Sequence, residues 1–152
     1  MVKLIEEKNE KKEIAELVLL DLPDWFGIPE NTKNYINESS VLPFFAYFFN
    51  NQPIGFITLK ETSPYTAEIH CMGILKKYHR CSFGRELFRA FEKYTREQGY
   101  LFIQVKTVKQ GCYDEYDKTN IFYKSMGFYE LEVFPTLWDK RNPCQIFIKS
   151  IL

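Results

Sequence analysis

The stretch from Ile74 to Gly99 reads ILKKYHRCSFGRELFRAFEKYTREQG and predicts a strand end, a tight loop and a helix. After the loop, apolar residues recur at steps of three and four, while charged residues fill the other face. Gly99 is a typical helix stop. The pattern predicts an amphipathic helix over residues 83–98. Its apolar face would consist of Phe83, Leu87, Phe88, Ala90, Phe91 and Tyr94.

The loop before this helix, residues 79–84, carries two cationic side chains, a hydroxyl and a glycine. The first backbone N–H groups of a helix have no partner inside it, and the helix dipole makes that end positive. Such an end is suited to binding phosphate. The alternative is an ordinary connection between a strand and a helix, with a solvated charged face.

Composition narrows the class of protein. The content is 45% hydrophobic and 17% aromatic, which predicts a single globular domain over residues 1–152. Twenty basic and twenty acidic residues cancel, so we expect no binding to nucleic acid or to a membrane surface. With no bilayer-spanning run and no signal peptide, we expect a cytoplasmic protein. The four cysteines have no C-x-x-C spacing and the chain has only two histidines, which argues against a zinc site. In a reducing compartment we expect free thiols, with Cys71 and Cys144 buried in strands.

Periodicity along the rest of the chain predicts an α+β fold. Residues 43–75 should form an antiparallel meander of three strands, and the helix after it should lead through a right-handed crossover to a parallel strand. Residues 135–143 look too long for a minimal hairpin turn. We expect a mixed, mostly antiparallel sheet of about seven strands with about four helices. The expected helices are 13–20, 29–39, 83–98 and 118–125, and the expected strands are 2–8, 43–49, 54–61, 66–75, 101–108, 128–134 and 145–152.

This order of elements, together with two motifs, resembles the GNAT superfamily of acyl-CoA-dependent N-acyltransferases over essentially the whole chain. The family's Q/R-x-x-G-x-G/A loop aligns with HRCSFG at residues 79–84, and its aromatic–Tyr pair before Gly-Phe aligns with FYKSMGF at residues 122–128. The resemblance implies acetyl-CoA as the cofactor and an amine as the acceptor. Two departures are His79 in place of Gln or Arg and Ser82 in place of the first glycine. The Cβ of Ser82 would hold the backbone slightly further from a pyrophosphate, or its hydroxyl would act as a compensating donor.

The resemblance also implies how coenzyme A is held. The strand end would offer backbone groups to the pantetheine arm, and the loop would wrap the pyrophosphate. A strand bulge is expected at Met72–Gly73, and a backbone N–H near Gly73 or Ile74 could then polarise the thioester carbonyl. Tyr116 stands where many members have Asn. The cofactor-binding residues are predicted to be Met72, Gly73, Ile74, Leu75, Lys76, His79, Arg80, Cys81, Ser82, Phe83, Gly84, Arg85, Tyr116, Thr119 and Phe122.

Three residues are candidates for the chemistry. The resemblance implies that Tyr123 gives a proton to the coenzyme A thiolate and that Glu68 is the base. A base is needed because an amine with a pKa of about 10 is protonated at neutral pH. His70 lies two residues after Glu68, on the same face of the strand. The alternatives are that this face is simply solvated, that His70 is a hydrogen-bonded core residue, and that Tyr123 only packs in the core.

The acceptor side is expected to include Asp24, Trp25, Phe26 and Trp138, again by resemblance. Trp25 and Phe26 could equally plug the core. Acidic residues beside these aromatics would favour a cationic amine, or they are ordinary surface charges. A small molecule and a peptide amine both fit this pattern. The apolar C-terminal strands could pair in a homodimer, by analogy of fold alone.

The alternative to an enzyme is a non-catalytic acyl-CoA-binding module of the same fold. Ser82 and Tyr116, which depart from the family pattern, motivate this alternative. Tyr123 and Glu68 favour the enzyme, because a binding module has no need of a proton donor and a base.

Overall fold

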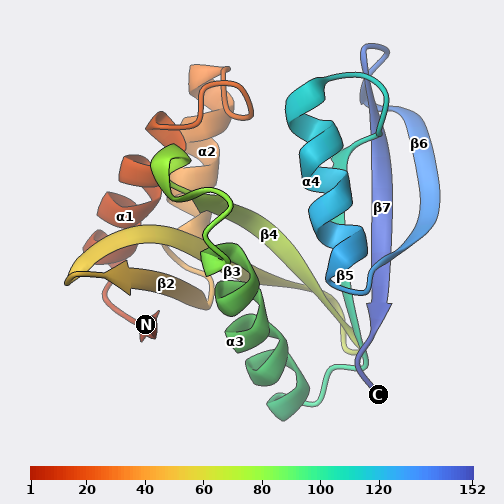
Figure 1. Cartoon of the computed structure of the whole chain (residues 1–152). Coiled ribbons are helices and arrows are strands. Elements are labelled where there is room, and N and C mark those ends of the chain that lie inside the picture. Colours follow the sequence, from red (N-terminus) through yellow and green to blue (C-terminus); the bar gives the residue numbers. More distant parts are fainter.

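The computed structural model describes residues 1–152 as a seven-stranded sheet with four α-helices (Figure 1). The sheet has the order β1-β2-β3-β4-β5-β7-β6, and all neighbours are antiparallel except β4 and β5. The strands are β1 (Val2–Ile5), β2 (Phe44–Phe49), β3 (Gln52–Ser63), β4 (Thr66–Ile74), β5 (Phe102–Val108), β6 (Tyr129–Asp139) and β7 (Asn142–Ser150). The helices are α1 (Lys8–Leu20), α2 (Pro29–Ser39), α3 (Phe83–Glu97) and α4 (Asp114–Ser125). The predicted α+β class, the antiparallel meander and the parallel crossover are confirmed.

Two apolar clusters lie on opposite faces of the sheet. One joins α3 and α4 to the sheet and contains Leu87, Phe91 and Tyr123. The other joins α1 to the sheet and contains Val18 and Phe56. The sheet is therefore covered on one face by α3 and α4 and on the other by α1 and α2.

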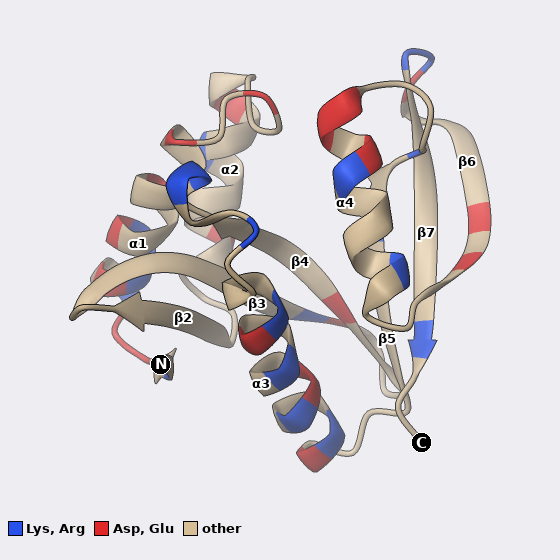
Figure 2. Cartoon of the chain, viewed as in Figure 1, with Lys and Arg blue, Asp and Glu red and all other residues tan.

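Figure 2 shows acidic and basic residues alternating along α3, and basic residues on the segment that leads from β4 to α3.

Strands β4 and β5 pair over only part of their length. Their pairs run from Thr66–Phe102 to Ile69–Val105, although β4 continues to Ile74 and β5 to Val108. In Figure 1 the two strands lie together near the C-terminus and separate toward the top of the view. We call the unpaired ends, residues 70–74 of β4 and 106–108 of β5, the fork.

A bulge in β4 marks the start of the fork. Thr58 of β3 faces Cys71, but its neighbour Leu59 faces Ile69, so His70 is an extra residue. The bulge expected at Met72–Gly73 is therefore misplaced. Gly73 instead lies beneath α1, where a Cβ would come within 2.9 Å of Val18 Cγ1. Close packing of α1 therefore explains the glycine at this position. The bulge itself lies at His70, whose φ is not positive, so the bulge needs no glycine.

Several predicted boundaries are wrong. Strand β1 ends at Ile5 instead of residue 8, and helix α1 begins at Lys8 instead of residue 13. Helix α4 begins at Asp114 instead of residue 118, and acidic residues in its first turn favour the positive helix end. The last two strands are joined by a tight turn, because Asp139 Oδ1 accepts hydrogen bonds from the N–H groups of Arg141 and Asn142. Trp138 consequently lies in a strand and not in a long loop.

The four cysteines are free, and Cys71 and Cys144 are buried as predicted. None of the helices combines the length and the apolar composition needed to cross a membrane.

Gly73→Ala should lower the free energy of unfolding by about 1–3 kcal/mol, because the new methyl would press on Val18 and Leu22 in a packed core. Gly84→Ala is the matched control. Its Cβ would lie 3.4 Å from Phe122, in ordinary contact, and alanine favours a helix. Urea denaturation of both variants measures the difference. Equal stability in the two variants would contradict the close packing at Gly73.

Candidate active site at the strand fork

The loop before α3 presents unpaired donors. Arg80 and Ser82 both have a φ of 65°, which turns the backbone sharply into the helix. No side chain caps the first turn of α3, so its leading N–H groups are free. The side chains of Arg80 and Arg85 are exposed and have no ion-pair partner within the chain. Free N–H groups and two unpaired cations at a helix start suit a pyrophosphate.

His79 braces this loop against the end of β4. Its Nε2 lies 2.6 Å from the Ile74 carbonyl oxygen, so the ring nitrogen donates to it. The ring also meets Trp25 edge to face, with centroids 5.8 Å apart. The residue that departs from the family pattern therefore holds the loop to the strand.

The predicted backbone contacts at the strand end have partners inside the chain. Leu75 N–H donates to the Ile54 carbonyl at 2.8 Å, and Lys76 N–H donates to Asp21 Oδ2 at 2.7 Å. The Ile74 carbonyl is taken by His79. A pantetheine arm that used these three groups would have to replace existing hydrogen bonds, so their assignment stays a prediction.

Gly84 lies where α3, α4 and β4 meet. A Cβ on it would stand 3.4 Å from Phe122 Cε1 and 3.9 Å from Ile74 Cγ1. Anything larger than a methyl would push into the Phe122 ring. The glycine thus keeps the start of α3 close to both walls of the fork.

The loop between α1 and α2 reaches across to α4. Trp25 Nε1 donates to Thr119 Oγ1 at 3.1 Å, and the Tyr116 hydroxyl donates to the Trp25 carbonyl at 2.9 Å. Burial raises the pKa of Tyr116, so this hydroxyl remains a donor at neutral pH. Asp24 adds an exposed ion pair with Lys76 at 3.7 Å. Residues predicted separately for cofactor and acceptor are therefore in direct contact.

Tyr123 is buried among the rings of Phe122, Phe128 and Phe147. Its hydroxyl makes no hydrogen bond within the chain. The hydroxyl oxygen keeps some exposure to solvent, because it is not one of the side-chain oxygens that are both fully buried and without a hydrogen bond. Burial raises the pKa of this hydroxyl well above the usual value, and the nearby Cys71 thiol adds to the effect. Tyr123 is therefore a protonated hydroxyl with a free donor.

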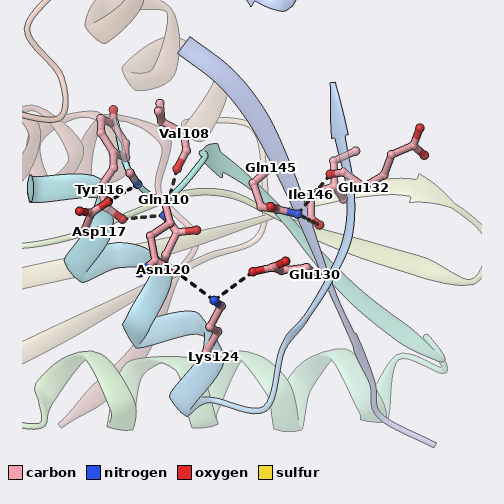
Figure 3. A network of polar contacts seen from close by, with 11 residues as sticks. Val108, Gln110, Tyr116, Asp117, Asn120, Lys124, Glu130, Glu132, Gln145 and Ile146 are labelled. Atoms are coloured by element: carbon pink, nitrogen blue, oxygen red, sulfur yellow. Dashed lines mark hydrogen bonds and ion pairs between the residues drawn. The ribbon is translucent and has the colours of Figure 1, made fainter. Parts of the chain in front are cut away.

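Asn120 anchors α4 to the end of β5 (Figure 3). Its Nδ2 donates to the Val108 carbonyl at 2.9 Å and to the Tyr116 carbonyl at 2.7 Å. The side chain is only 1% exposed. Sequence reasoning missed this residue. The available signal was a polar side chain one turn before Tyr123, on the buried face of the same helix.

Glu68 lies on the opposite face of the sheet from α3 and is almost fully buried. Its Oε1 accepts from Gln104 Nε2 at 3.1 Å and lies 3.3 Å from Lys106 Nζ. Its Oε2 has no partner within the chain. Gln104 and Lys106 were not predicted, because the register of two parallel strands cannot be read from either strand alone.

His70 shares the face of Glu68 but has other partners. Its Nε2 lies 2.7 Å from Glu38 Oε2, and its ring packs on Tyr35 with centroids 5.5 Å apart. Burial raises the pKa of Tyr35 to about 12, and both Glu38 and Glu68 contribute. Tyr35 therefore lies within the electrostatic reach of both carboxylates, and no hydrogen bond or ion pair joins His70 to Glu68.

The other two predicted acceptor residues, Phe26 and Trp138, lie in different places, and only Phe26 adjoins the cluster of His70 and Tyr35. Phe26 packs edge to face on Tyr35, at 5.8 Å, and lines a surface groove between α1 and α2. Trp138 is 44% exposed on edge strand β6 and has no hydrogen bond or ring contact with the other predicted residues.

The model of the Acetyltransferase (GNAT) family matches residues 11–128, which include the fork, the loop before α3 and α4. The chain belongs to the GNAT acetyltransferase family. The resemblance drawn from the two motifs is thereby confirmed. No curated protein sequence matches the chain.

Solved acetyltransferases share the GNAT fold of this chain. An aminoglycoside 6'-N-acetyltransferase complexed with coenzyme A is 16% identical, with a TM-score of 0.75 over 100% of this chain and 97% of its own. The aminoglycoside 6'-N-acetyltransferase from Enterococcus faecium is 18% identical, with the same TM-score and coverage. A ribosomal-protein alanine N-acetyltransferase from Escherichia coli is 15% identical, with a TM-score of 0.74 over 99% and 94%. At these identities the likeness establishes the fold.

Ser82→Gly should raise the free energy of unfolding of this GNAT protein by about 1 kcal/mol, because glycine relieves the left-handed backbone at this position. Ser82→Ala keeps the Cβ and should bring no such gain. Urea denaturation compares the two variants. A similar change in both would mean that the backbone angle costs nothing here.

Proposed function

We propose that this GNAT protein transfers the acetyl group of acetyl-CoA to a primary amine of a small molecule or peptide, by direct attack in a ternary complex. The observation that carries the proposal is the fork, which connects the two faces of the sheet. The start of α3, which suits a phosphate, and the unpaired Tyr123 hydroxyl lie toward one face of the sheet. The Glu68 carboxylate lies toward the other face.

Binding would use the groups left free around the loop before α3. The leading N–H groups of α3, with Arg80 and Arg85, would hold the pyrophosphate. Gly84 brings the start of α3 against Phe122 and Ile74, so the pyrophosphate site would lie next to the fork that takes the pantetheine arm. These features fit coenzyme A, and they would supply the anchoring that converts an encounter of two reactants into a reaction within one complex.

The chain's own residues would then manage two protons. When bound, acetyl-CoA supplies a thioester carbonyl carbon open to attack by an amine. Glu68 Oε2, which has no partner in the chain, would take the proton of the incoming ammonium group, directly or through water. Tyr123 would give its proton to the departing sulfur, and its raised pKa keeps that proton in place at neutral pH.

The first test is calorimetric titration with acetyl-CoA, followed by a thiol-release assay over a panel of amines. We expect binding, and turnover on at least one amine. Tyr123→Phe should bind acetyl-CoA as well as the parent protein but lower kcat by about 100-fold, because it loses only the proton donor. Absence of binding would overturn the proposal. Binding without turnover on any amine would favour the non-catalytic module.

Glu68→Gln should lower the rate most at neutral pH and shift the optimum upward, because the amine must then lose its proton unaided. Tyr123 should not limit the rate on the alkaline side below its raised pKa. His70→Gln is the control, since His70 is paired with Glu38 and not with Glu68. The pH profile of kcat/KM measures both variants. An upward shift in His70→Gln instead would transfer the role of base to His70.

A further inference from the structure

We propose that Lys106 is a site of self-acetylation. The inference rests on the proposed function and names a second acceptor, one that belongs to the chain itself. Lys106 follows Val105, the last residue of β5 that pairs with β4, so it stands at the opening of the fork. Its amine lies 3.3 Å from the carboxylate that the proposed reaction uses as a base.

The ion pair of Lys106 differs from the other lysine–carboxylate pairs of the chain. Lys106 is 37% exposed and its partner only 7%. The pairs of Lys76, Lys93 and Lys124 involve exposed acids on the surface. Lys149 is 16% exposed and its partner is buried, so that amine is enclosed with its carboxylate. Lys106 alone combines a reachable amine with a buried carboxylate.

The carboxylate is what makes an acyl transfer to this lysine feasible. A lysine amine has an ordinary pKa of about 10.4, so it must lose a proton before it can attack. Glu68 is close enough to take that proton directly. The unshared pair of Lys106 Nζ then forms a bond to the thioester carbonyl carbon, and the carbon–sulfur bond breaks.

The protons balance as in the reaction with a free amine. Tyr123 gives its proton to the departing sulfur and takes back, through water, the second proton that the nitrogen loses as the amide forms. Glu68 releases to water the first proton, which it took from the ammonium group. The products are an acetylated Lys106, the coenzyme A thiol and one proton. The acetylated side chain carries no charge, so Glu68 loses its ion pair. An added acceptor amine would compete with Lys106 for the same acetyl group.

The test incubates the full chain with acetyl-CoA and no acceptor, and maps acetylated lysines by mass spectrometry of peptides over time. Lys106 should be modified about tenfold faster than any other lysine, at a rate independent of protein concentration, because the reaction is intramolecular. Excess free coenzyme A should block it. Glu68→Gln should lower the rate at Lys106 toward that of exposed lysines, and thermal unfolding would establish that this variant is folded.

Lys109→Arg is the matched control, because Lys109 is an exposed lysine near the same strand end without a carboxylate partner. It should leave the modification of Lys106 unchanged, whereas Lys106→Arg should abolish it. Acetyl groups spread evenly over the lysines, or an unchanged rate in Glu68→Gln, would overturn the inference. If acetyl-CoA binds and an added amine is acetylated while Lys106 stays unmodified, only this inference fails. If acetyl-CoA does not bind, the proposed function fails as well.

Discussion

The separation of β4 from β5 is the constraint on which the rest of the structure depends. Where the strands part, backbone groups that would have paired across the sheet need other partners, since an unpaired buried group is costly. On each strand of the fork, a side chain supplies the missing hydrogen-bond partner. His79 donates to the Ile74 carbonyl on β4, and Asn120 donates to the Val108 carbonyl on β5. The separated strand ends are thus stabilised by His79, which precedes α3, and by Asn120, which lies within α4.

The same two side chains position the residues of the proposed chemistry. Asn120 lies one turn before Tyr123, so the bond that anchors α4 also places the Tyr123 hydroxyl. His79 holds the loop whose helix end suits a pyrophosphate. Glu68 is held on the other face by Gln104 and Lys106, which keep a buried carboxylate from standing unpaired. The residues that anchor the fork therefore also position the groups of the proposed function.

The elements around the fork differ in how firmly they are held. Trp25 joins the α1–α2 loop to Thr119 and Tyr116 of α4 through two hydrogen bonds, so this loop is fixed against α4. Trp138 lies on the edge strand without such ties. The similar solved structures include an aminoglycoside acetyltransferase and a ribosomal-protein alanine acetyltransferase, so one fold serves different acceptors. On physical grounds, acceptor choice belongs to the loops that border the site.

The sequence alone determined the elements whose signals are local. The amphipathic pattern predicted α3, the alternating strands predicted the meander, and the two motifs predicted the family, because each depends on residues close together in the chain. Only the tertiary structure decided the bulge at His70, the partners of Glu68 and the anchor at Asn120. These depend on register between distant strands and on which side chain meets an unpaired carbonyl. The register and the choice of partner are both decided by contacts between residues that are far apart in the sequence, so no local pattern indicates them.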